Sequence, residues 1–387
     1  MSAAGAPPAL RVLHVVNAMD MGGAESVVVE HVRHASPGVQ SLVCALNGGG
    51  RALETVRSLG ARTFDLAGAG PVARLARLRA LMRAERVDVV NAHNPTGTLY
   101  GVPAGRWAGV PAVFRTEHTI HYPRRHSGAY PALEVVLTAM CDRVVCVCEA
   151  VRASHTRRLA WAAERFVTVV NGVAEHRPSA PRAVLRAALG LEPGAPAALA
   201  LGGMRMPKAF DVLLEGFARV VRGGSPAQLV MAGDGALRAA LERQAGTLGI
   251  ADRVRWLGAR TDGGDLVEAC DLFVVSSRRE GLSLSLLEAM RGGRASVVTR
   301  VGGNAEAVED GVTGLVVPAG DAEALARAMG ELLGDGARRE RMGVEARARW
   351  ARAFTAERMV RDTEALYHAA LGRPAPAAAP AEADACA

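Results

Sequence analysis

Lysine is almost absent from this 387-residue chain: Lys208 is the only one, against 45 arginines. Aromatic residues make up 4% of the sequence, too few for the stacking platforms that bind bases or polysaccharide chains. The six cysteines form no C-x-x-C pair and have no partnering histidine spacing, which argues against zinc and a disulfide framework. No apolar run approaches about 18 residues, and the first residues lack a signal-peptide pattern. We therefore expect a protein of the reducing cytoplasm without a membrane span.

The composition is that of a globular protein, with 50% apolar and 22% charged residues. Its length fits two domains of roughly 150–200 residues each. The net charge of +7 is uneven, because residues 1–175 hold 19 arginines against 13 acidic residues whereas the remainder is almost balanced. This asymmetry favours an anionic partner for the first half. Nucleic acid is not expected, since the basic residues lack interleaved aromatics and any reading motif.

Short β-branched runs alternate with helical segments along the whole chain, which predicts βαβ units and parallel sheets. In the first half, strands are expected at 10–16, 41–45, 62–65, 88–92, 112–116, 143–148 and 167–170. In the second half, they are expected at 197–201, 228–232, 254–257, 272–276, 296–299 and 315–318, followed by a helical stretch at 337–371.

These runs predict an α/β protein with two facing, doubly wound, Rossmann-like domains. The expected divisions are a first domain at 1–175, a linker at 176–196, a second domain at 197–350, a carboxyl-terminal helix at 351–371 and a disordered tail at 372–387. Ligands of such sheets lie outside the carboxyl ends of the strands, so the cleft between the domains is the expected site.

Three strand-end loops carry glycine pairs: Gly22-Gly23, Gly202-Gly203 and Gly302-Gly303. Glycine lets backbone N–H groups approach a phosphate closely, although a single pair equally suits a tight turn. Arg205 and Lys208 follow the second pair, at the expected start of a helix, where cations oppose the local dipole unless an anion is bound. A solvated basic loop is the alternative.

Two glutamates, Glu280 and Glu288, follow the strand expected at 272–276. Glu280 lies in the loop after a strand, and Glu288 lies about one turn inside the following helix. A carboxylate at this edge can accept hydrogen bonds from two sugar hydroxyls, as the acidic residue of dinucleotide-binding folds does with ribose. The alternative is a pair of surface glutamates near a helix start, where acids are favoured anyway.

In combination, Glu280-x7-Glu288, Arg205 with Lys208, Gly302-Gly303-Asn-Ala-Glu306 and Gly22-Gly23-Ala-Glu25 resemble the family 4 glycosyltransferases over roughly residues 9–371. The resemblance implies the GT-B arrangement, with a nucleotide-sugar donor bound mainly by the second domain. It also implies transfer with retention of anomeric configuration and no metal or other cofactor.

The resemblance assigns roles residue by residue. Lys208 and Arg205 would neutralise the donor diphosphate as it leaves. Glu288 would hold the ribose hydroxyls, and Glu280 would hold hydroxyls of the transferred sugar. His118 matches the histidine that such enzymes place beside the donor sugar, although a lone histidine after a strand is more often structural. Further donor contacts are expected from Gly22, Gly23, Leu257, Arg260, Gly281, Leu282, Ser283, Gly302 and Gly303, and an acceptor contact from His93.

Several positions depart from the family pattern. Ala209 stands where glycine is usual, Ser283 and Ala295 stand where proline is common, and Cys148 replaces a usual serine. These changes concern loop rigidity, because no charged residue of the expected site is lost.

The sequence thus predicts a retaining hexosyltransferase that uses a nucleotide sugar, with a UDP-sugar favoured over GDP-mannose. Its acceptor would be a hydroxyl group in cell-surface glycan, exopolysaccharide or glycolipid synthesis, or alternatively in a small secondary metabolite. A nucleotide-sugar epimerase and a non-catalytic nucleotide-sugar-binding protein share the fold and stay open. The arginine-rich helix at 72–86 has two interpretations, a peripheral contact with the inner membrane or an ordinary solvated face.

Overall fold

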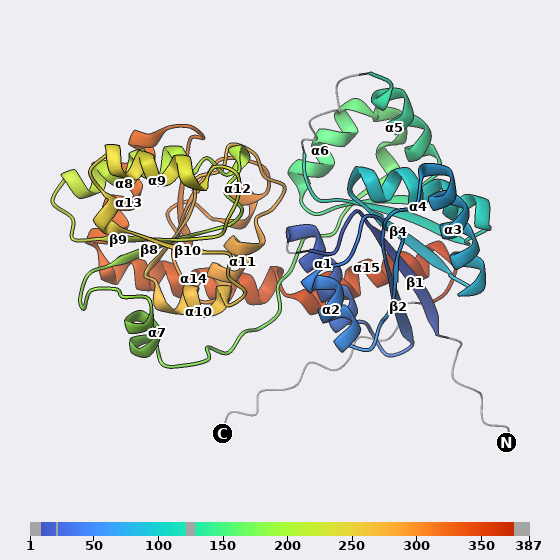
Figure 1. Cartoon of the computed structure of the whole chain (residues 1–387), viewed down its shortest axis with the longest axis horizontal. Coiled ribbons are helices and arrows are strands. Elements are labelled where there is room, and N and C mark those ends of the chain that lie inside the picture. The colour runs from blue at the N-terminus through green and yellow to red at the C-terminus, as the bar shows by residue number, and fades with distance from the viewer. Residues whose placement is uncertain (1–8, 21, 121–127, 375–387) are drawn as a thin grey trace.

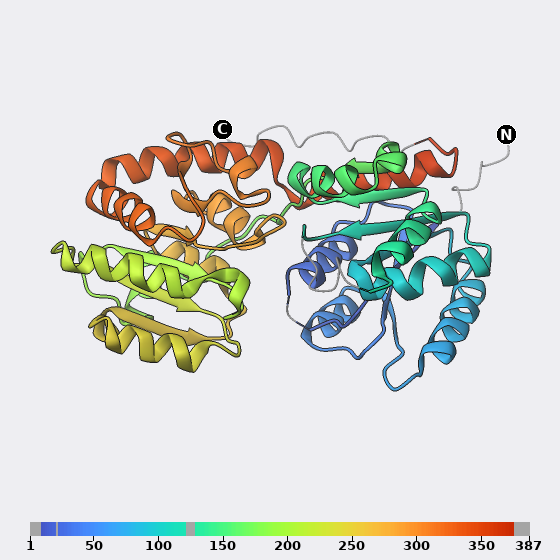
Figure 2. The same cartoon turned by 90° about the horizontal axis from the view of Figure 1, so that it is seen from above.

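The computed structural model describes residues 9–20, 22–120 and 128–374. In this part of the chain, two parallel β-sheets are each covered by helices on both faces, and the two units lie side by side (Figure 1). The α/β class with two doubly wound, Rossmann-like domains is therefore confirmed. Figure 2 shows each sheet between its helical layers.

The first sheet has seven strands in the order β3-β2-β1-β4-β5-β6-β7. The strands are β1 (Leu10–Val16), β2 (Val39–Ala45), β3 (Arg62–Asp65), β4 (Val89–His93), β5 (Ala112–Glu117), β6 (Arg143–Cys146) and β7 (Phe166–Thr168). The helices are α1 (Gly23–Arg33), α2 (Arg51–Ser58), α3 (Pro71–Ala84), α4 (Asn94–Ala108), α5 (Tyr130–Ala139), α6 (Glu149–Arg158) and the 3-10 helix η1 (Ala160–Arg165). All residues of β4 and β5 are buried, as a parallel sheet covered on both faces requires.

The second sheet has six strands in the order β10-β9-β8-β11-β12-β13. The strands are β8 (Ala197–Leu201), β9 (Gln228–Ala232), β10 (Val254–Gly258), β11 (Leu272–Val275), β12 (Ser296–Thr299) and β13 (Gly314–Val317). The helices of this half of the chain are α7 (Arg182–Ala188), η2 (Met206–Lys208), α8 (Phe210–Arg222), α9 (Arg238–Thr247), η3 (Ala251–Arg253), α10 (Gly263–Ala269), α11 (Leu284–Arg291), α12 (Asn304–Ala307), α13 (Ala322–Gly334) and α14 (Gly336–Ala353), and the last helix, α15 (Ala356–Ala370), lies against the first sheet.

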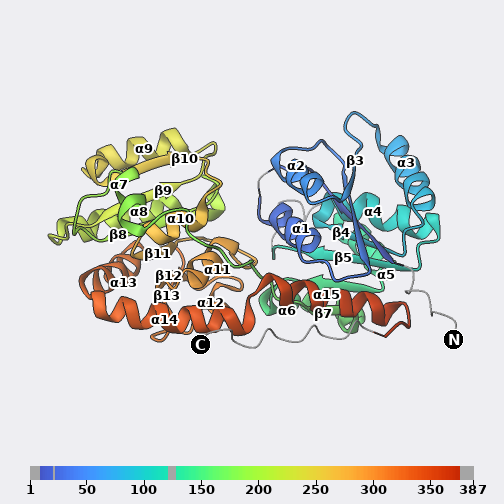
Figure 3. The same ribbon diagram turned by 90° about the horizontal axis from the view of Figure 1, so that it is seen from below.

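The helical stretch expected at 337–371 is broken at Phe354 and Thr355, between α14 and α15. The Thr355 side chain caps α15 by accepting a hydrogen bond from a backbone N–H one turn later. At the break the chain meets the other interdomain crossing, where the Val173 N–H donates to the Phe354 carbonyl at 3.0 Å. A Cβ at Gly172 would lie 2.0 Å from the Thr355 carbonyl oxygen, so only glycine allows this approach. The break lets the last helix return to the first domain (Figure 3).

Helix α15 is anchored in that domain by Tyr367. Its hydroxyl accepts a hydrogen bond from the Asn91 side chain on β4 at 2.7 Å, and its ring packs edge-on against Phe114 of β5 at 4.9 Å between centroids. Because Tyr367 is 1% exposed, these contacts bury this part of α15 against the first sheet. The two domains are thus joined by two crossings rather than one.

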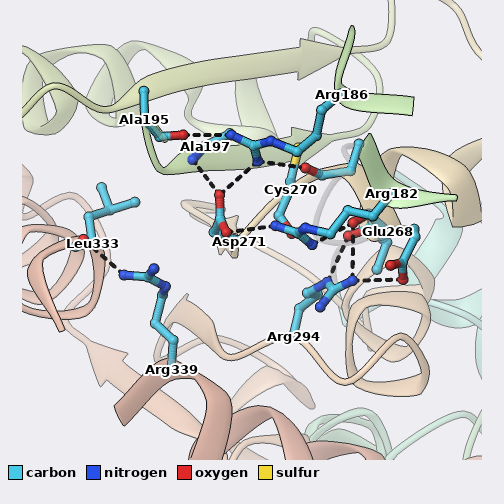
Figure 4. Close-up of polar contacts among 12 residues, drawn as sticks. Arg182, Arg186, Ala195, Ala197, Glu268, Cys270, Asp271, Arg294, Leu333 and Arg339 are labelled. Carbon is cyan, nitrogen blue, oxygen red and sulfur yellow. Dashed lines mark hydrogen bonds and ion pairs between the residues drawn. The ribbon is translucent and has the colours of Figure 1, made fainter. Parts of the chain in front are cut away.

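Arginine side chains fasten the amino-terminal edge of the second sheet (Figure 4). The Asp271 carboxylate accepts hydrogen bonds from Arg182, from Arg186 and from the backbone N–H of Ala197. The same two guanidinium groups also bind backbone carbonyls at Ala195, Glu268, Ala269 and Cys270, and Arg339 binds those of Leu332 and Leu333. A guanidinium fork has five donors and can bridge several acceptors at once, which an ammonium on a flexible stem does less well.

Helix α3 carries the arginines that the membrane interpretation relied on. Its apolar residues Leu78 and Met82 are buried in the core, whereas an interfacial helix would present them to lipid. Arg74 stacks over the Tyr100 ring at 5.0 Å and Arg79 over the Trp107 ring at 4.5 Å, so these two side chains pack α3 against α4. Within the described residues, no helix combines the length and the apolarity that crossing a bilayer requires.

Candidate active site

Lys208 lies at the end of the 3-10 turn η2, at the carboxyl edge of the second sheet. Its ammonium group contacts a carboxylate oxygen of Glu280, which also accepts a hydrogen bond from the Ser277 hydroxyl at 2.9 Å. The lysine stem passes over Gly202, where a Cβ would lie 3.2 Å from the lysine Cε and where φ is +151°. Glycine at 202 therefore gives the stem room. The structure brings Lys208 and Glu280 together, 72 residues apart in sequence.

The loop that bears Glu280 is tied to the turn that bears Lys208. The backbone N–H of Arg278 donates to the Pro207 carbonyl at 2.8 Å, and its guanidinium group forms a two-bond ion pair with Asp211 at 2.7 and 2.8 Å. The Ser276 hydroxyl donates to the Lys208 carbonyl at 2.9 Å. These bonds fix the backbone of Lys208 against β11. The lysine is therefore held at its backbone by these bonds and at its ammonium group by Glu280.

Arg205 stands at the entrance of the same loop and is exposed. Its side chain makes no hydrogen bond or ion pair with the residues that the structure describes. A cation in this setting is available to an incoming anion, as Lys208 is through the donors that Glu280 leaves unused.

Glu288 lies in α11, where its side chain is half-buried. Its carboxylate faces the first residue of α10, because a Cβ at Gly263 would lie 3.2 Å from its Oε2. Burial raises the pKa of this carboxyl group, and the charge of Arg291 opposes that rise. The Glu288 carboxylate has no hydrogen-bond partner among the described residues. A half-buried carboxylate without a donor is costly, and hydroxyl groups of a ligand would supply the missing donors.

The two domains touch at the Glu280 loop. A Cβ at Gly281 would lie 2.1 Å from the carbonyl oxygen of His118, which follows β5 in the first domain. A Cβ at Gly303 would lie 2.8 Å from the Cβ of Cys148, and the Gly303 N–H donates to the Gly281 carbonyl. Glycine at 281 and 303 thus permits close packing of backbone between the domains. The N–H of Gly303 is already used inside the protein.

Glu306 adds a second link between the domains. Its carboxylate accepts hydrogen bonds from the backbone N–H groups of Glu149 and Ala150, at 2.9 and 2.6 Å. These N–H groups are the first of helix α6, so a side chain of the second domain caps a helix of the first.

Histidines run from the cleft into the first domain. His118 Nε2 lies 3.0 Å from His93 Nδ1, and His93 Nε2 lies 3.0 Å from His14 Nδ1. The ring of His31, on α1, stacks on His14 with 5.3 Å between centroids. His14, His31 and His93 are buried, at 1%, 5% and 1% exposure. His118 and His93, expected as separate donor and acceptor contacts, therefore belong to one connected group.

Burial lowers the pKa of each of these histidines. The pKa values of His14 and His118 fall to about 4, and those of His93 and His31 fall well below 6.5, helped by the neighbouring imidazoles. The Glu117 carboxylate opposes the fall at His118. At neutral pH the group is uncharged.

Gly22 and Gly23 begin helix α1, with Gly22 at the N-cap position. The Glu25 carboxylate folds back over Gly22, where a Cβ would lie 2.3 Å from its Oε2. Burial, with help from Asp20, raises the pKa of Glu25, and Arg205 across the cleft opposes the rise. The helix start expected to approach a phosphate therefore holds an acidic side chain of its own.

The remaining predicted donor contacts lie around this centre. Leu257 is in β10, and Arg260 is exposed and paired with Asp262 at 2.8 Å. Leu282 and Ser283 are buried beside Gly281, with the Ser283 N–H 3.4 Å from the side-chain oxygen of Asn304. A Cβ at Gly302 would lie 2.3 Å from the Glu280 carbonyl oxygen, so Gly302 packs under the Glu280 loop. The ligand contacts of all these residues stay predictions.

The sequence did not predict that His14 and His31 belong to this region, nor that Glu306 caps α6. His14 interrupts the apolar run of β1 and His31 lies on the buried face of α1, which was the available signal. Neither position indicated its partner, because His93 is 79 residues from His14. Glu306 was noted only as part of a family motif.

Among residues 9–20, 22–120 and 128–374, no group of three or more histidine, cysteine or acidic side chains is arranged to hold a metal ion. The expectation of a metal-independent reaction stays a prediction.

Comparison with protein families gives a match for each half of the chain. Residues 21–177 match the model described as Glycosyltransferase Family 4, and residues 195–335 match the model described as Glycosyl transferases group 1. Together these segments include both sides of the cleft.

Curated relatives are similar over part of their length. The lipopolysaccharide core biosynthesis glycosyltransferase LpsE of Rhizobium meliloti is 36% identical over 160 residues, covering 41% of this chain and 46% of LpsE. The alpha-D-kanosaminyltransferase of Streptomyces kanamyceticus is 36% identical over 169 residues, covering 43% of this chain and 44% of that enzyme. The matched region thus spans less than half the length of these relatives.

Solved structures share the whole fold. The Anabaena protein Alr3699/HepE, crystallised with UDP, superimposes with a TM-score of 0.82 at 20% identity, covering 93% of this chain and all of that one. Sucrose-phosphate synthase of Thermosynechococcus elongatus superimposes with a TM-score of 0.75 at 19% identity, covering 94% and 99%. The two-domain arrangement of this chain is the GT-B fold.

The buried histidines predict that the protein loses stability as pH falls from about 6.5 towards 4. In this interval the unfolded chain holds histidine protons that the folded chain does not, because the folded pKa values of His14 and His118 are about 4. The free energy of unfolding should therefore decrease as the pH is lowered, by up to about 1.4 kcal/mol per pH unit for each such histidine. Urea unfolding at a series of pH values measures this slope.

His31→Leu is the matched variant for this prediction. It removes one buried imidazole, which stacks on His14 but forms no hydrogen bond with the other histidines. The slope of the unfolding free energy against pH should therefore decrease by up to about 1.4 kcal/mol per pH unit. Comparing slopes rather than absolute stabilities cancels the opposite contributions of Glu25 and Glu288, whose pKa values are raised. An unchanged slope in the variant would contradict the assignment.

Proposed function

The chain belongs to the family 4 glycosyltransferases, and from this premise we propose that it moves a hexosyl unit from a nucleotide sugar to a hydroxyl acceptor with retention of configuration. The observation that carries the proposal is the meeting of Lys208 and Glu280 at the strand-end edge where Gly281 touches His118. Cations for a diphosphate and carboxylates for sugar hydroxyls then lie at one point between two domains.

In the proposed reaction, Lys208 and Arg205 act on the leaving group. As the bond between the sugar carbon and the phosphate oxygen breaks, negative charge grows on the diphosphate, and these cations stabilise it. Glu280, already oriented by Ser277, accepts hydrogen bonds from hydroxyls of the transferred sugar. The acceptor oxygen attacks from the same face, and its proton passes to the departing phosphate oxygen, so no carboxylate nucleophile is needed.

A UDP-sugar is the favoured donor, ahead of GDP-mannose. The support is that the Anabaena neighbour was crystallised with UDP and with UDP-glucose. For the acceptor, relatives named for lipopolysaccharide core synthesis favour a cell-surface glycan or glycolipid. The kanosaminyltransferase relative favours the second candidate, a small secondary metabolite.

The proposal is tested by incubating the protein with UDP-, GDP- and ADP-sugars without metal and measuring nucleotide release and thermal protection. The UDP-sugars are expected to protect the fold and release nucleotide. Lys208→Ala should lower turnover by at least about tenfold, which corresponds to roughly 1.4 kcal/mol of leaving-group stabilisation. Arg219→Ala, which removes an exposed cation of α8, is the matched control and should keep full turnover.

Each of four outcomes would overturn part of the proposal. Failure of every donor to protect the protein or release nucleotide would reject the glycosyltransferase function. Protection without release by any donor would favour a non-catalytic nucleotide-sugar-binding protein. Full activity in Lys208→Ala would remove the leaving-group role of that residue. Interconversion of the donor sugar with its epimer would favour a nucleotide-sugar epimerase.

Glu288→Gln should separate stability from donor binding. At neutral pH the half-buried carboxylate costs folding energy, because partial desolvation raises its pKa, and the neutral amide removes that cost. The melting temperature should stay equal or rise, while the affinity for the nucleotide falls about tenfold through the lost acceptor bonds to ribose. Thermal unfolding and calorimetric titration with UDP check the two effects, and a variant that binds UDP with unchanged affinity would contradict the ribose role.

We also propose a peripheral contact between the first domain and an anionic membrane surface. Since the apolar face of α3 is packed in the core, the attraction would come from charge alone, with Arg77, Arg83 and Arg86 exposed. Sedimentation with phosphatidylglycerol vesicles should show binding at low salt that is lost near 0.5 M, roughly where screening is strong. Binding that resists high salt would contradict a purely electrostatic contact.

A further inference from the structure

His118 is held from behind by a chain of imidazoles. From His14 in the middle of β1, the chain passes to His93 at the end of β4 and then to His118 just beyond β5, so it rises towards the carboxyl edge of the sheet. Each link is a 3.0 Å contact between ring nitrogens. The contact uses Nε2 of His118 and leaves its Nδ1 as the nitrogen available to a ligand.

Three neutral imidazoles linked in this order have two possible proton arrangements. A hydrogen bond needs one donor and one acceptor, and each neutral ring carries one proton. If His118 is protonated on Nδ1, then His93 must donate from Nδ1 and His14 must also donate from Nδ1. If His118 is protonated on Nε2, the other two rings must be protonated on Nε2 as well. The state of His14 is therefore tied to the state of His118.

The inner end of the chain decides between the two arrangements. His14 is 1% exposed, and its Nε2 has no hydrogen-bond partner among the described residues. In the second arrangement this nitrogen would carry an N–H with no acceptor among the described residues, whereas in the first it carries only a lone pair. Orphaned N–H groups are the rarer and costlier of the two in protein interiors. The first arrangement is favoured.

We infer that His14 and His93 are positioning residues that hold His118 in the Nδ1–H form, so that His118 presents a hydrogen-bond donor to the sugar in the cleft. This inference rests on the proposed function for the identity of the ligand. The sugar hydroxyl that meets His118 then serves as the acceptor.

The neutral state of the chain suits this role. A neutral ring places no full positive charge beside the sugar carbon, which becomes electron-poor as the leaving group departs. The titratable groups that face the chain are His31 from α1 and Glu117 at the end of β5. Only Glu117 favours a charged His118, and burial outweighs it.

The first test reads the proton positions directly in the ligand-free, full-length protein. Two-bond proton–nitrogen spectra of histidine-labelled protein distinguish protonated from bare ring nitrogens, and His118→Gln assigns the His118 signals. All three histidines of the chain are expected to be protonated on Nδ1. A bare Nδ1 at His118 would overturn the inference, whatever the activity.

The second test breaks the chain at its middle. His93→Gln keeps a donor and an acceptor between His14 and His118, whereas His93→Met fills the space without either. His93→Met should produce a mixture of His118 tautomers and lower kcat/KM for the donor about tenfold, the loss expected of one hydrogen bond. His93→Gln should stay within about threefold of the unchanged protein, with His118 still protonated on Nδ1.

His31→Leu is the control, because it removes a stacked ring of the same cluster that lies outside the hydrogen-bonded chain. It should leave the His118 tautomer unchanged, and a change there would show that packing rather than the chain sets it. If His93→Met does not fold, the spectra of the unchanged protein and of His93→Gln still decide. A protein that binds no nucleotide sugar would reject the proposed function alone, since the tautomer is read without a donor.

Discussion

The close approach of Gly281 to the carbonyl of His118 is the contact on which the arrangement of the site depends. A Cβ at position 281 would lie 2.1 Å from that oxygen, and one at 302 would lie 2.3 Å from the Glu280 carbonyl oxygen. Backbone from β5, from the Glu280 loop and from the loop before α12 is thereby stacked without side chains between. Only glycine permits this spacing. The loop that holds Glu280 against Lys208 is thereby packed on the residue that ends the histidine chain.

The two interdomain crossings make this contact possible. Gly172 and Val173 in the first crossing pack against Phe354 and Thr355 in the second, so the two crossings form one joint rather than two independent linkers. Beyond the joint, α15 is bound to the first sheet through Tyr367. A chain that returned only once would leave the orientation of the carboxyl edges to a flexible linker. The cap that Glu306 places on α6 then holds the same orientation from the side of the cleft.

Most of the fold was predictable because short stretches of sequence determine where its strands and helices lie. The apolar runs located every strand end to within two residues, and the alternation of strands with helices implied parallel sheets. The Lys208–Glu280 contact was predictable only as a shared edge, since two strand-end loops of one sheet meet there. His14 and the break at Phe354 depend on partners far away in sequence, and no local pattern encodes them. Ala209 adds a further case: it adopts a left-handed φ of +51° with a buried methyl group, where the family usually has glycine.

The contrast between Lys208 and the arginines follows from what each side chain is asked to bind. Around Asp271, guanidinium groups bridge a carboxylate and several helix-end carbonyls, and a planar fork satisfies these fixed acceptors simultaneously. At position 208 the stem must pass over Gly202 within 3.2 Å of a would-be Cβ, and the head meets one carboxylate oxygen. A compact ammonium fits this narrow path and keeps rotatable donors for a second anion. The carboxyl edge at Glu280 therefore suits an ammonium group, whereas the amino-terminal edge around Asp271 suits guanidinium groups.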